Sequence, residues 1–295
     1  MPTSIITSMY NRKPATIETV DNLFFPSILN NASSDKELVI LDDCSPLEQE
    51  TRAMVEKYLR DLKKRFGNVV FERNPENYGF GKSFNRGINL AGGDRLVVSN
   101  DDVYFPLESV DLLAATLLES DKFGLIAPIT NEKTSWTYQY CKQAPKLKSY
   151  SPEELEKLES FAKHARESMK GIRIAVDNVS GFCFAINSDL LREIGTFDES
   201  FEYGLFEDTD LAKRVGQEYK IIINPEVFVN HGGLKGASGS LLQQPIKTSY
   251  YAVVNAFKHG RKWSYLNTLR GIAFGLYSQT GRGTVSELFE EKWNQ

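Results

Sequence analysis

The sequence contains few cysteines, and their spacing excludes two kinds of structural site. Only three of its 295 residues are cysteines, and no two of them form a Cys-x-x-Cys pair. They are Cys44, Cys141 and Cys183. A disulfide framework or a structural zinc site requires cysteines at closer and more regular spacing. We therefore expect reduced thiols, as in a cytoplasmic protein.

The sequence also lacks a large positive charge and long apolar segments. Its formal net charge is −4 at pH 7, whereas proteins that bind nucleic acid through phosphate contacts need a basic surface. No segment approaches the roughly 18 consecutive apolar residues of a membrane-spanning helix. The N-terminus carries no charged-then-apolar leader. We expect no nucleic-acid partner, no secretion and no membrane span.

What the first half does contain is an alternation of short apolar runs and helical patterns. With 41% hydrophobic and 25% charged residues, the composition is that of an ordinary globular protein. Strands are predicted near residues 5–6, 38–41, 68–71 and 95–98, and helices at 54–66, 82–90 and 110–118. This alternation predicts an α/β fold with a mainly parallel central sheet flanked by helices. Ligands bind beyond the carboxyl ends of such strands.

The pattern changes after Pro128. Ser151, Pro152 and two glutamates predict an N-cap and an acidic first turn. The charged helix that follows runs to about residue 170, and we interpret it as an exposed insertion. Strands are expected at 182–186, 221–223 and 227–229, and a helix at 207–215. The sequence thus predicts a mixed second half, then a Gly- and Ser-rich loop and a mostly helical tail.

Two acidic residues, Asp101 and Asp102, come directly after a predicted strand and follow Asn100. Adjacent carboxylates at a strand's carboxyl end can bind a hard cation such as Mg²⁺ or Mn²⁺, together with the oxygens of a bound diphosphate. A plain acidic turn or a helix N-cap explains the pair equally well. Taken alone, the pattern leaves both readings open.

A second acidic cluster lies at the start of a predicted helix, where Glu207, Asp208 and Asp210 fall within four residues. The helix dipole favours acids at this position. Three carboxylates exceed what capping needs, and like-charge neighbours raise a carboxyl pKa toward values useful for a general base. Both a cap and a catalytic base fit the pattern.

One histidine and one glycine-containing loop complete the candidate site. His231 ends a predicted strand just before two glycines, a place where a metal ligand can be presented, although a lone histidine is more often structural. The loop from Asn77 to Lys82 opens a helix, where backbone N–H groups can meet an anion. Its glycine spacing fits neither the Walker pattern nor the dinucleotide-binding fingerprint. An ATPase or a dehydrogenase is therefore not supported.

The order of these motifs resembles glycosyltransferase family 2, whose members have the GT-A fold. The resemblance covers roughly residues 4–233 and rests on seven matches in sequence order. The matches are Tyr10-Asn11-Arg12, Leu41-Asp42-Asp43-Cys44-Ser45, the glycine-containing stretch from Asn77 to Gly87, Asn100-Asp101-Asp102, Gly181-Phe182-Cys183-Phe184, the stretch from Ile194 to Glu199, and Glu207 to Arg214 with Val229-Asn230-His231 downstream. Cys44 replaces a glycine of the family's pattern, and Asn100 replaces the first acid of its Asp-x-Asp.

The resemblance implies a division of the chain into three parts. Residues 1–105 would form a nucleotide-sugar-binding half. Residues 106–235 would form an acceptor-binding and catalytic half, with a helical insertion near 150–172, and residues 236–295 a C-terminal helical extension. Nucleotide contacts are expected from Tyr10, Asn11, Arg12, Asp42, Asn77, Gly79, Asn100 and Asp101. Asp101 is the middle residue of Asn100-Asp101-Asp102, so the alternative to a nucleotide contact is that its side chain faces solvent.

The same resemblance implies the catalytic roles. Asp102 and His231 would bind a divalent metal, Mn²⁺ or Mg²⁺, and Asp208 would be the general base, with Glu207 orienting it or the acceptor. Arg214 lies in the matched motif and is grouped with the acceptor contacts. These roles predict a metal-dependent, inverting hexosyl- or deoxyhexosyltransferase. It would use a nucleotide-diphosphate sugar donor in polysaccharide or glycoconjugate biosynthesis.

Two other functions remain open. A nucleotidyltransferase would use a similar sheet, nucleotide and metal, but its first strand is typically followed by a glycine-rich loop, which is missing here. A non-catalytic nucleotide-sugar or carbohydrate-binding protein is the second alternative, because Asn100 interrupts the acidic pair. Retention of both Asp208 and His231 favours the enzyme.

The acceptor is the least defined part of the prediction. Trp136 lies among alternating aromatics that can stack on a sugar ring or fill a core. The tail from 250 to 282 mixes aromatic and basic residues. Such a tail can pack against the catalytic half, or it can lie on an anionic membrane that holds a lipid-linked saccharide acceptor. We expect a cytoplasmic protein, with peripheral contact at the inner membrane face as the second possibility.

Overall fold

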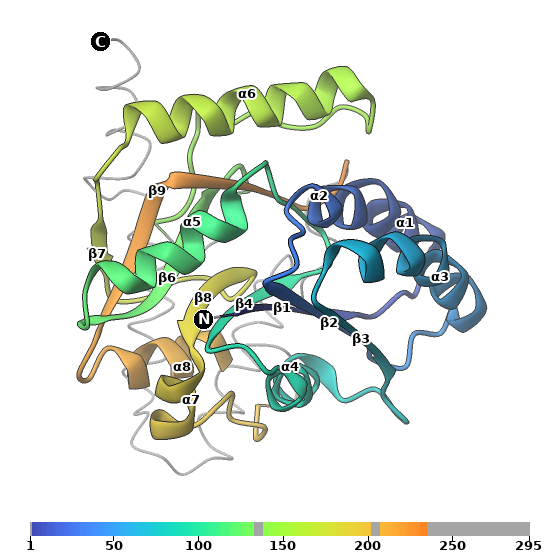
Figure 1. Cartoon of the computed structure of the whole chain (residues 1–295), viewed down its shortest axis with the longest axis horizontal. Helices are drawn as coiled ribbons and strands as arrows, with labels where there is room; N and C mark the ends of the chain where they lie inside the picture. Colours follow the sequence, from blue (N-terminus) through green and yellow to red (C-terminus); the bar gives the residue numbers. More distant parts are fainter. Residues whose placement is uncertain (1, 133–137, 202–206, 235–295) are drawn as a thin grey trace, which may run out of the picture.

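The computed structural model describes residues 2–132, 138–201 and 207–234. Within these residues, nine strands form one sheet in the order β3-β2-β1-β4-β8-β6-β9-β5, and β7 also pairs with β9. Helices cover the sheet on both faces (Figure 1). The predicted α/β fold is confirmed.

The amino-terminal half is the parallel part of the sheet. Its strands are β1 (Thr3–Met9), β2 (Lys36–Asp42), β3 (Asn68–Arg73) and β4 (Arg95–Asn100), all parallel to their neighbours in this group. Met9 lies opposite Asp42, and Ser8 lies opposite Asn100. The carboxyl ends of these strands therefore meet at one edge, and the polar motifs that follow them are brought together.

Helices pack on this half because successive strand residues point to opposite faces. Ile5 belongs to a buried cluster with Phe25 and Val55, whereas its neighbour Ile6 packs in a second cluster with Phe84. The helical elements here are α1 (Pro14–Thr19), the π-helical turn Val20–Phe24, α2 (Phe25–Asn30), α3 (Glu48–Arg65) and α4 (Gly79–Leu90). Each face of the parallel half is thus buried under apolar side chains.

The second half adds antiparallel pairings. Its strands are β5 (Val103–Tyr104), β6 (Phe123–Thr130), β7 (Ile174–Val176), β8 (Cys183–Asn187) and β9 (Lys220–His231). Its helical elements are α5 (Ser109–Thr116), the 3₁₀ turn Leu117–Glu119, α6 (Pro152–Ser168), α7 (Ser188–Ile194) and α8 (Glu207–Val215). Strand β8 runs antiparallel between β4 and β6, and β9 runs parallel to β6. The mixed second half is as predicted.

One strand prediction was wrong in detail. The sequence predicted two strands at 221–223 and 227–229, whereas the structure has the single strand β9. The interruption around Pro225 is absorbed as a shift in the pairing register with β6, between Pro128 and Ile129. Because β9 continues through this irregularity, His231 at its carboxyl end lies at the same edge of the sheet as the carboxyl end of β4.

The charged helix was expected to be exposed, and this was wrong for one of its faces; that it is an insertion stays a prediction. Helix α6 lies along β9 (Figure 1), and the ring of Phe161 packs edge-on against Phe228 with their centroids 4.8 Å apart. Its buried face comprises Leu158, Phe161, Ala162 and Ala165. The predicted N-cap is present, because Ser151 accepts a hydrogen bond from the Glu154 N–H. Helix α6 is therefore part of the core, with its charges on the outer face.

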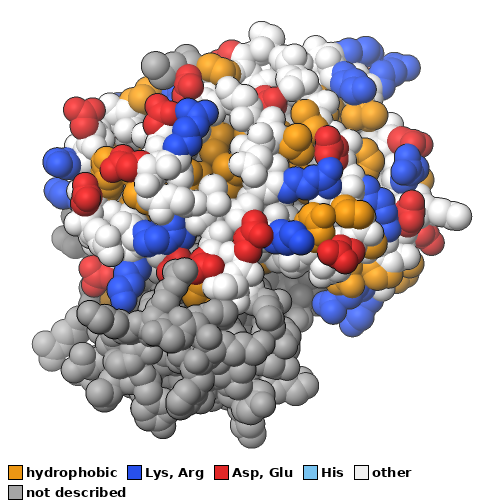
Figure 2. Space-filling model, turned by 90° about the horizontal axis from the view of Figure 1, so that it is seen from below, with side chains coloured by type: hydrophobic (Ala, Val, Ile, Leu, Met, Phe, Trp, Pro, Cys, Tyr) orange, Lys and Arg blue, Asp and Glu red, His pale blue; other side chains and the backbone are white. Residues whose placement is uncertain are grey.

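The surface agrees with the mixed charge of the sequence. Figure 2 shows basic and acidic side chains interspersed over the described part of the face that it presents. Among the described residues, no helix is long and apolar enough to cross a membrane. The predicted helical extension at 236–295 lies outside the described residues, as does the 250–282 segment expected to contact a membrane or the catalytic half.

Candidate functional site

Asp102 and His231, far apart in sequence, are brought together by a short antiparallel ladder. Val103 of β5 lies opposite His231 at the end of β9, and Asp102 directly precedes Val103. Asp102 is therefore brought next to the histidine. The Nε2 atom of His231 lies 3.4 Å from Oδ1 of Asp102, and both side chains are largely buried. The Gly232 N–H also donates to the Asp102 carbonyl at 2.9 Å.

The polar atoms of this pair are suited to a cation. Asp102 Oδ1 and both ring nitrogens of His231 are buried without a hydrogen-bond partner among the described residues. Buried polar atoms are otherwise nearly always bonded. The carboxylate suits Mn²⁺ or Mg²⁺, whereas the imidazole favours the transition metal Mn²⁺ of the two, and the remaining ligands would be oxygens of a bound diphosphate. No group of three or more His, Cys, Asp or Glu that could hold a metal occurs among the described residues.

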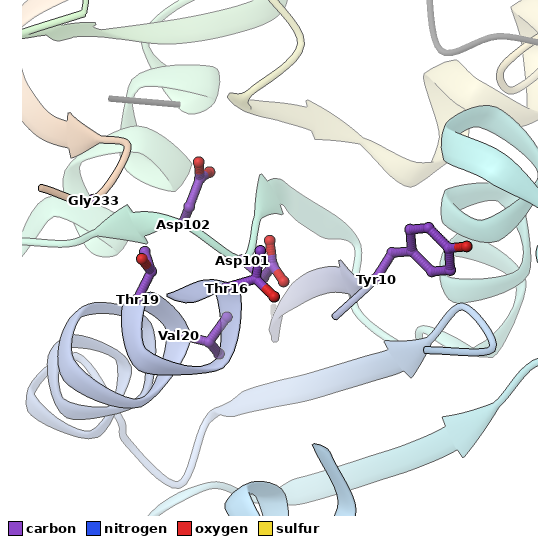
Figure 3. A pocket seen from close by; sticks show the side chains of 7 residues that line it. All are labelled: Tyr10, Thr16, Thr19, Val20, Asp101, Asp102 and Gly233. Carbon is purple, nitrogen blue, oxygen red and sulfur yellow. The ribbon is translucent and has the colours of Figure 1, made fainter. Parts of the chain in front are cut away.

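A pocket opens beside the pair (Figure 3). It is lined by Tyr10, Thr16, Thr19, Val20, Asp101, Asp102 and Gly233, from the end of β1, helix α1 with the turn after it, and the ends of β4 and β9. Asp101 lines this pocket and is half-buried. Burial and the adjacent Asp102 carboxylate raise the pKa of Asp101 to about 8. Asp101 is thus not freely exposed to solvent, the alternative considered for it.

Asp42, a predicted nucleotide contact at the end of β2, is held in an internal network. Asp42 accepts a hydrogen bond from the Ser45 N–H at 2.9 Å and forms an ion pair with Arg73. Arg73 also pairs with Glu48 at 3.2 Å. Because Asp42 is only 2% exposed, its side chain fixes the turn that follows β2, and the nucleotide contact predicted for it stays a prediction.

Asp43 was not among the predicted site residues, yet it organises the predicted loop. Its carboxylate accepts hydrogen bonds from the N–H groups of Tyr78 and Gly79, at 2.8 and 2.9 Å, and from Asn74 at 2.7 Å. The Asn77 side chain donates to the Asp43 carbonyl at 3.2 Å. Asp43 therefore supplies the cap that α4 lacks from its own residues. Burial raises the pKa of Asp43.

The turn after β1 divides into one buried and two accessible side chains. Asn11 is fully buried and donates to Thr51, while its backbone N–H donates to Ser45. Tyr10 is 38% exposed at the pocket, and the exposed Arg12 guanidinium lies 5.5 Å from the centre of its ring. Tyr10 and Arg12 are thus the members of this turn that can meet a ligand.

Asp208 and Glu207 occupy the first turn of α8. Asp208 Oδ2 accepts a hydrogen bond from the Gly181 N–H at 2.9 Å, and Oδ1 accepts from the Thr209 N–H at 2.7 Å. Glu207 is 2% exposed, and its Oε1 atom has no hydrogen-bond partner among the described residues. Burial raises the pKa of both carboxyls, that of Glu207 to about 8. Both shifts have the direction that suits a group that exchanges protons.

The remaining predicted residues differ in position. Arg214 donates to Asp210 within α8 and to the carbonyls of residues 194 to 196. These contacts anchor α8, and an acceptor contact by Arg214 stays a prediction. The Asn100 N–H donates to the Phe182 carbonyl at 2.8 Å, which holds the end of β4. Trp136 lies outside the described residues.

Comparison with known proteins adds a family and a fold. The family model described as "Glycosyl transferase family 2" matches residues 4–195. No curated protein sequence matches the chain. Solved structures are similar at only 16–17% identity, so they support the expected GT-A fold and nothing beyond it.

Three solved structures illustrate that fold. The mannosyltransferase PcManGT from Pyrobaculum calidifontis, in complex with GDP-Man and Mn²⁺, is similar at 17% identity and a TM-score of 0.55, over 96% of this chain and 76% of that one. S. aureus TarS 1–349 in complex with UDP-GlcNAc is similar at 16% identity and a TM-score of 0.54, over 94% and 72%. GalNAc-T7 with UDP, GalNAc and Mn²⁺ is similar at 16% identity and a TM-score of 0.59, over 99% and 54%.

Proposed function

The chain belongs to glycosyl transferase family 2, and from that premise we propose that it is a metal-dependent, inverting glycosyltransferase. The donor is a nucleotide-diphosphate sugar, and the acceptor is the hydroxyl of a saccharide or lipid-linked saccharide in polysaccharide or glycoconjugate biosynthesis. The observation that carries the proposal is the 3.4 Å approach of His231 to Asp102, with buried polar atoms that lack partners among the described residues. Mn²⁺ in two of the similar structures supports the choice of metal.

Donor binding is assigned to the carboxyl edge of the parallel half. Tyr10 and Arg12 offer an aromatic ring and a guanidinium beside the pocket. The loop that begins at Asn77 is held in place by Asp43, whose carboxylate occupies the Tyr78 and Gly79 N–H groups at the start of α4. Asp102 and His231 would hold the ion, which when bound offsets the charge that grows on the leaving diphosphate.

Asp208 is assigned as the general base. Its carboxylate would accept the proton of the acceptor hydroxyl as that oxygen forms a bond to the anomeric carbon and the bond to the diphosphate oxygen breaks. A single displacement of this kind inverts the anomeric centre. The Gly181 N–H fixes Oδ2 of the base at 2.9 Å, and buried Glu207 beside it is suited to donate a hydrogen bond to a sugar hydroxyl when protonated.

The proposal is tested first by donor binding. UDP-, GDP- and dTDP-sugars are screened by thermal shift with and without Mn²⁺, because a ligand that binds only the folded state raises the melting temperature by mass action. We expect at least one donor to stabilise the protein only when Mn²⁺ is present. The product of that donor with saccharide acceptors is then examined by NMR for its anomeric configuration.

The results separate the alternatives. Transfer with retained configuration would contradict the inverting mechanism. Donor binding without transfer or hydrolysis would favour the non-catalytic binding protein, the alternative that Asn100 in the acidic motif supports. Release of pyrophosphate from a nucleoside triphosphate and a sugar phosphate would identify a nucleotidyltransferase instead. The cytoplasmic location and the membrane contact of the tail belong to the same proposal and are tested by fractionation of cells.

A further inference from the structure

The ring of His231 is covered by an aromatic side chain from another element. Phe182, just before β8, stacks on the imidazole with the ring centroids 4.4 Å apart and the planes 13° from parallel. Phe182 is 2% exposed and belongs to a buried apolar cluster that includes Cys183 and Val229. Since its surroundings are closely packed, the Phe182 ring is held in place and can restrict the imidazole in turn.

His231 has little else to orient its ring. Neither ring nitrogen has a hydrogen-bond partner among the described residues, and the Asp102 carboxylate lies 3.4 Å away. The hydrogen bond from the His231 N–H to Asn131 at 2.9 Å fixes only the backbone. A metal-binding histidine is usually oriented through its second nitrogen by an outer hydrogen bond. Here the flat contact with Phe182 takes that place.

The same two residues also reach the proposed base. The Gly181 N–H donates to Oδ2 of Asp208 at 2.9 Å. A Cβ atom at Gly181 would lie 2.8 Å from Cβ of Asp208, so this close approach requires glycine. The carbonyl of Phe182 accepts from the Asn100 N–H, two residues before Asp102. Two consecutive residues thus contact the histidine, the base and the strand end that carries the acid.

We propose that Gly181 and Phe182 position the metal pair and the base relative to each other. The Phe182 ring holds the imidazole in the plane in which Nε2 faces Asp102, and the Gly181 N–H holds the Asp208 carboxylate. Phe182 contacts no reacting atom in this arrangement and acts through His231. The inference rests on the proposed function, because it concerns how that site binds its ion.

The test compares two leucine substitutions on neighbouring positions. Phe182→Leu removes the flat ring over His231. Phe184→Leu is the matched control, since Phe184 is 1% exposed and packs against Phe197, with their centroids 6.2 Å apart, in the core. The readout is the imidazole Cε1–H resonance of His231 in labelled full-length protein at constant pH. The chain has three histidines, so His231→Ala assigns the signal.

In the wild type we expect this resonance upfield of that of free histidine, because the stacked ring shields it. Phe182→Leu should remove the upfield shift. It should also increase, by about tenfold, the Mn²⁺ concentration needed to broaden the signal to half its height, which is the lower limit for loss of a residue that orients a metal ligand. Phe184→Leu should change neither. Phe182→Tyr, which retains an aromatic ring, should restore both.

The outcomes distinguish this inference from the proposed function. If Mn²⁺ at low concentration does not broaden His231 in the wild type, the metal pair and the proposed function are wrong. If wild-type His231 is broadened but its resonance has no upfield shift, or if Phe182→Leu binds Mn²⁺ as the wild type does, the positioning role of Phe182 is wrong. The wild-type shift is informative even should Phe182→Leu fail to fold.

Discussion

The turn after β2 and the proposed metal and base residues differ in how their polar atoms are paired. Around Asp42 and Asp43, carboxylates accept hydrogen bonds from backbone N–H groups and from Asn74, and Asp42 pairs with Arg73. Among the proposed site residues, Asp102, His231 and Glu207 keep buried atoms without hydrogen-bond partners among the described residues. The first region is organised by the chain itself, whereas the second retains unpaired polar atoms that bound ligands can complete.

Of these two sets of residues, only the second carries the energetic cost of unpaired buried atoms. Buried polar atoms without partners destabilise a fold by about 1–3 kcal/mol each, and such atoms concentrate where function requires them. Substitutions in the first region should therefore act on stability. Substitutions in the second should act on metal binding and turnover, with little loss of stability or a gain. Four predictions test that separation.

The largest effect is expected at the base. Asp208→Asn should lower kcat by about 10²–10⁴-fold, because removal of a general base costs that much, while donor affinity with Mn²⁺ stays as in the wild type. Asp189→Asn, at an exposed position on α7, is the control and should leave both unchanged. Steady-state kinetics and calorimetry measure the two quantities. Near wild-type turnover in Asp208→Asn would refute the base assignment.

The metal pair should give the next largest effect. We expect His231→Ala to weaken Mn²⁺ binding by at least about tenfold, since even loss of an outer partner costs that much. The melting temperature without metal should fall only modestly, because the lost packing on Phe182 is offset by removal of two unpaired buried nitrogens. The free-ion EPR signal reports the affinity, and His164→Ala, on α6, serves as the comparison. Equal Mn²⁺ affinity in the two variants would argue against His231 as a ligand.

In the first region, Asp43→Ala should instead reduce stability. The substitution removes the acceptor of the Tyr78 and Gly79 N–H groups and one of the two acceptors of the Asn74 side chain. We expect the free energy of unfolding to fall by about 2 kcal/mol, with unchanged Mn²⁺ affinity. Urea unfolding and EPR measure the two. A wild-type unfolding free energy would show that the network contributes nothing.

Per pH unit, the smallest effect on the free energy of unfolding is the pH dependence due to Glu207. Burial raises its pKa from 4.5 to about 8 in the folded protein, so the folded state binds a proton more tightly than the unfolded state. The stability that this proton contributes is complete below about pH 4.5 and is lost as pH rises toward 8. Glu207→Gln should remove this decrease in unfolding free energy, which is at most about 1.4 kcal/mol per pH unit. Parallel pH slopes of unfolding free energy for both proteins, measured in EDTA, would contradict the shift.

The sequence predicted most of the strands and the motifs that follow them, because short apolar runs bounded by polar turns leave few alternatives, but it did not predict the short strands β5 and β7. The acidic start of α8 and the N-cap Ser151 were likewise readable from local chemistry. The burial of α6 was not, because its apolar residues are few and its outer face is charged. That β9 continues past Pro225 depends on its pairing with β6, a tertiary effect.

Within the site, the pattern of residue types indicated the acids and the histidine but not their supports. Asp42 and Asp43 are adjacent and chemically identical, so nothing in the sequence distinguishes the partner of Arg73 from the cap of α4. Phe182 stood in a motif that matched the family, but an apolar residue gives no local signal of what it stacks on. Both roles arise from the packing of segments distant in sequence, which the structure alone provides.

The most direct test asks whether Asp102 and the metal act on the nucleotide while Asp208 does not. Thermal shifts are measured for wild type, Asp102→Ala and Asp208→Asn with UDP, GDP or dTDP, each with and without Mn²⁺. We predict a Mn²⁺-dependent rise in melting temperature for at least one nucleotide in the wild type, retained in Asp208→Asn and lost in Asp102→Ala. An equal Mn²⁺-dependent rise in Asp102→Ala and the wild type would contradict Asp102 as a metal ligand. No rise in the wild type with any of the three nucleotides would contradict metal-dependent nucleotide binding itself.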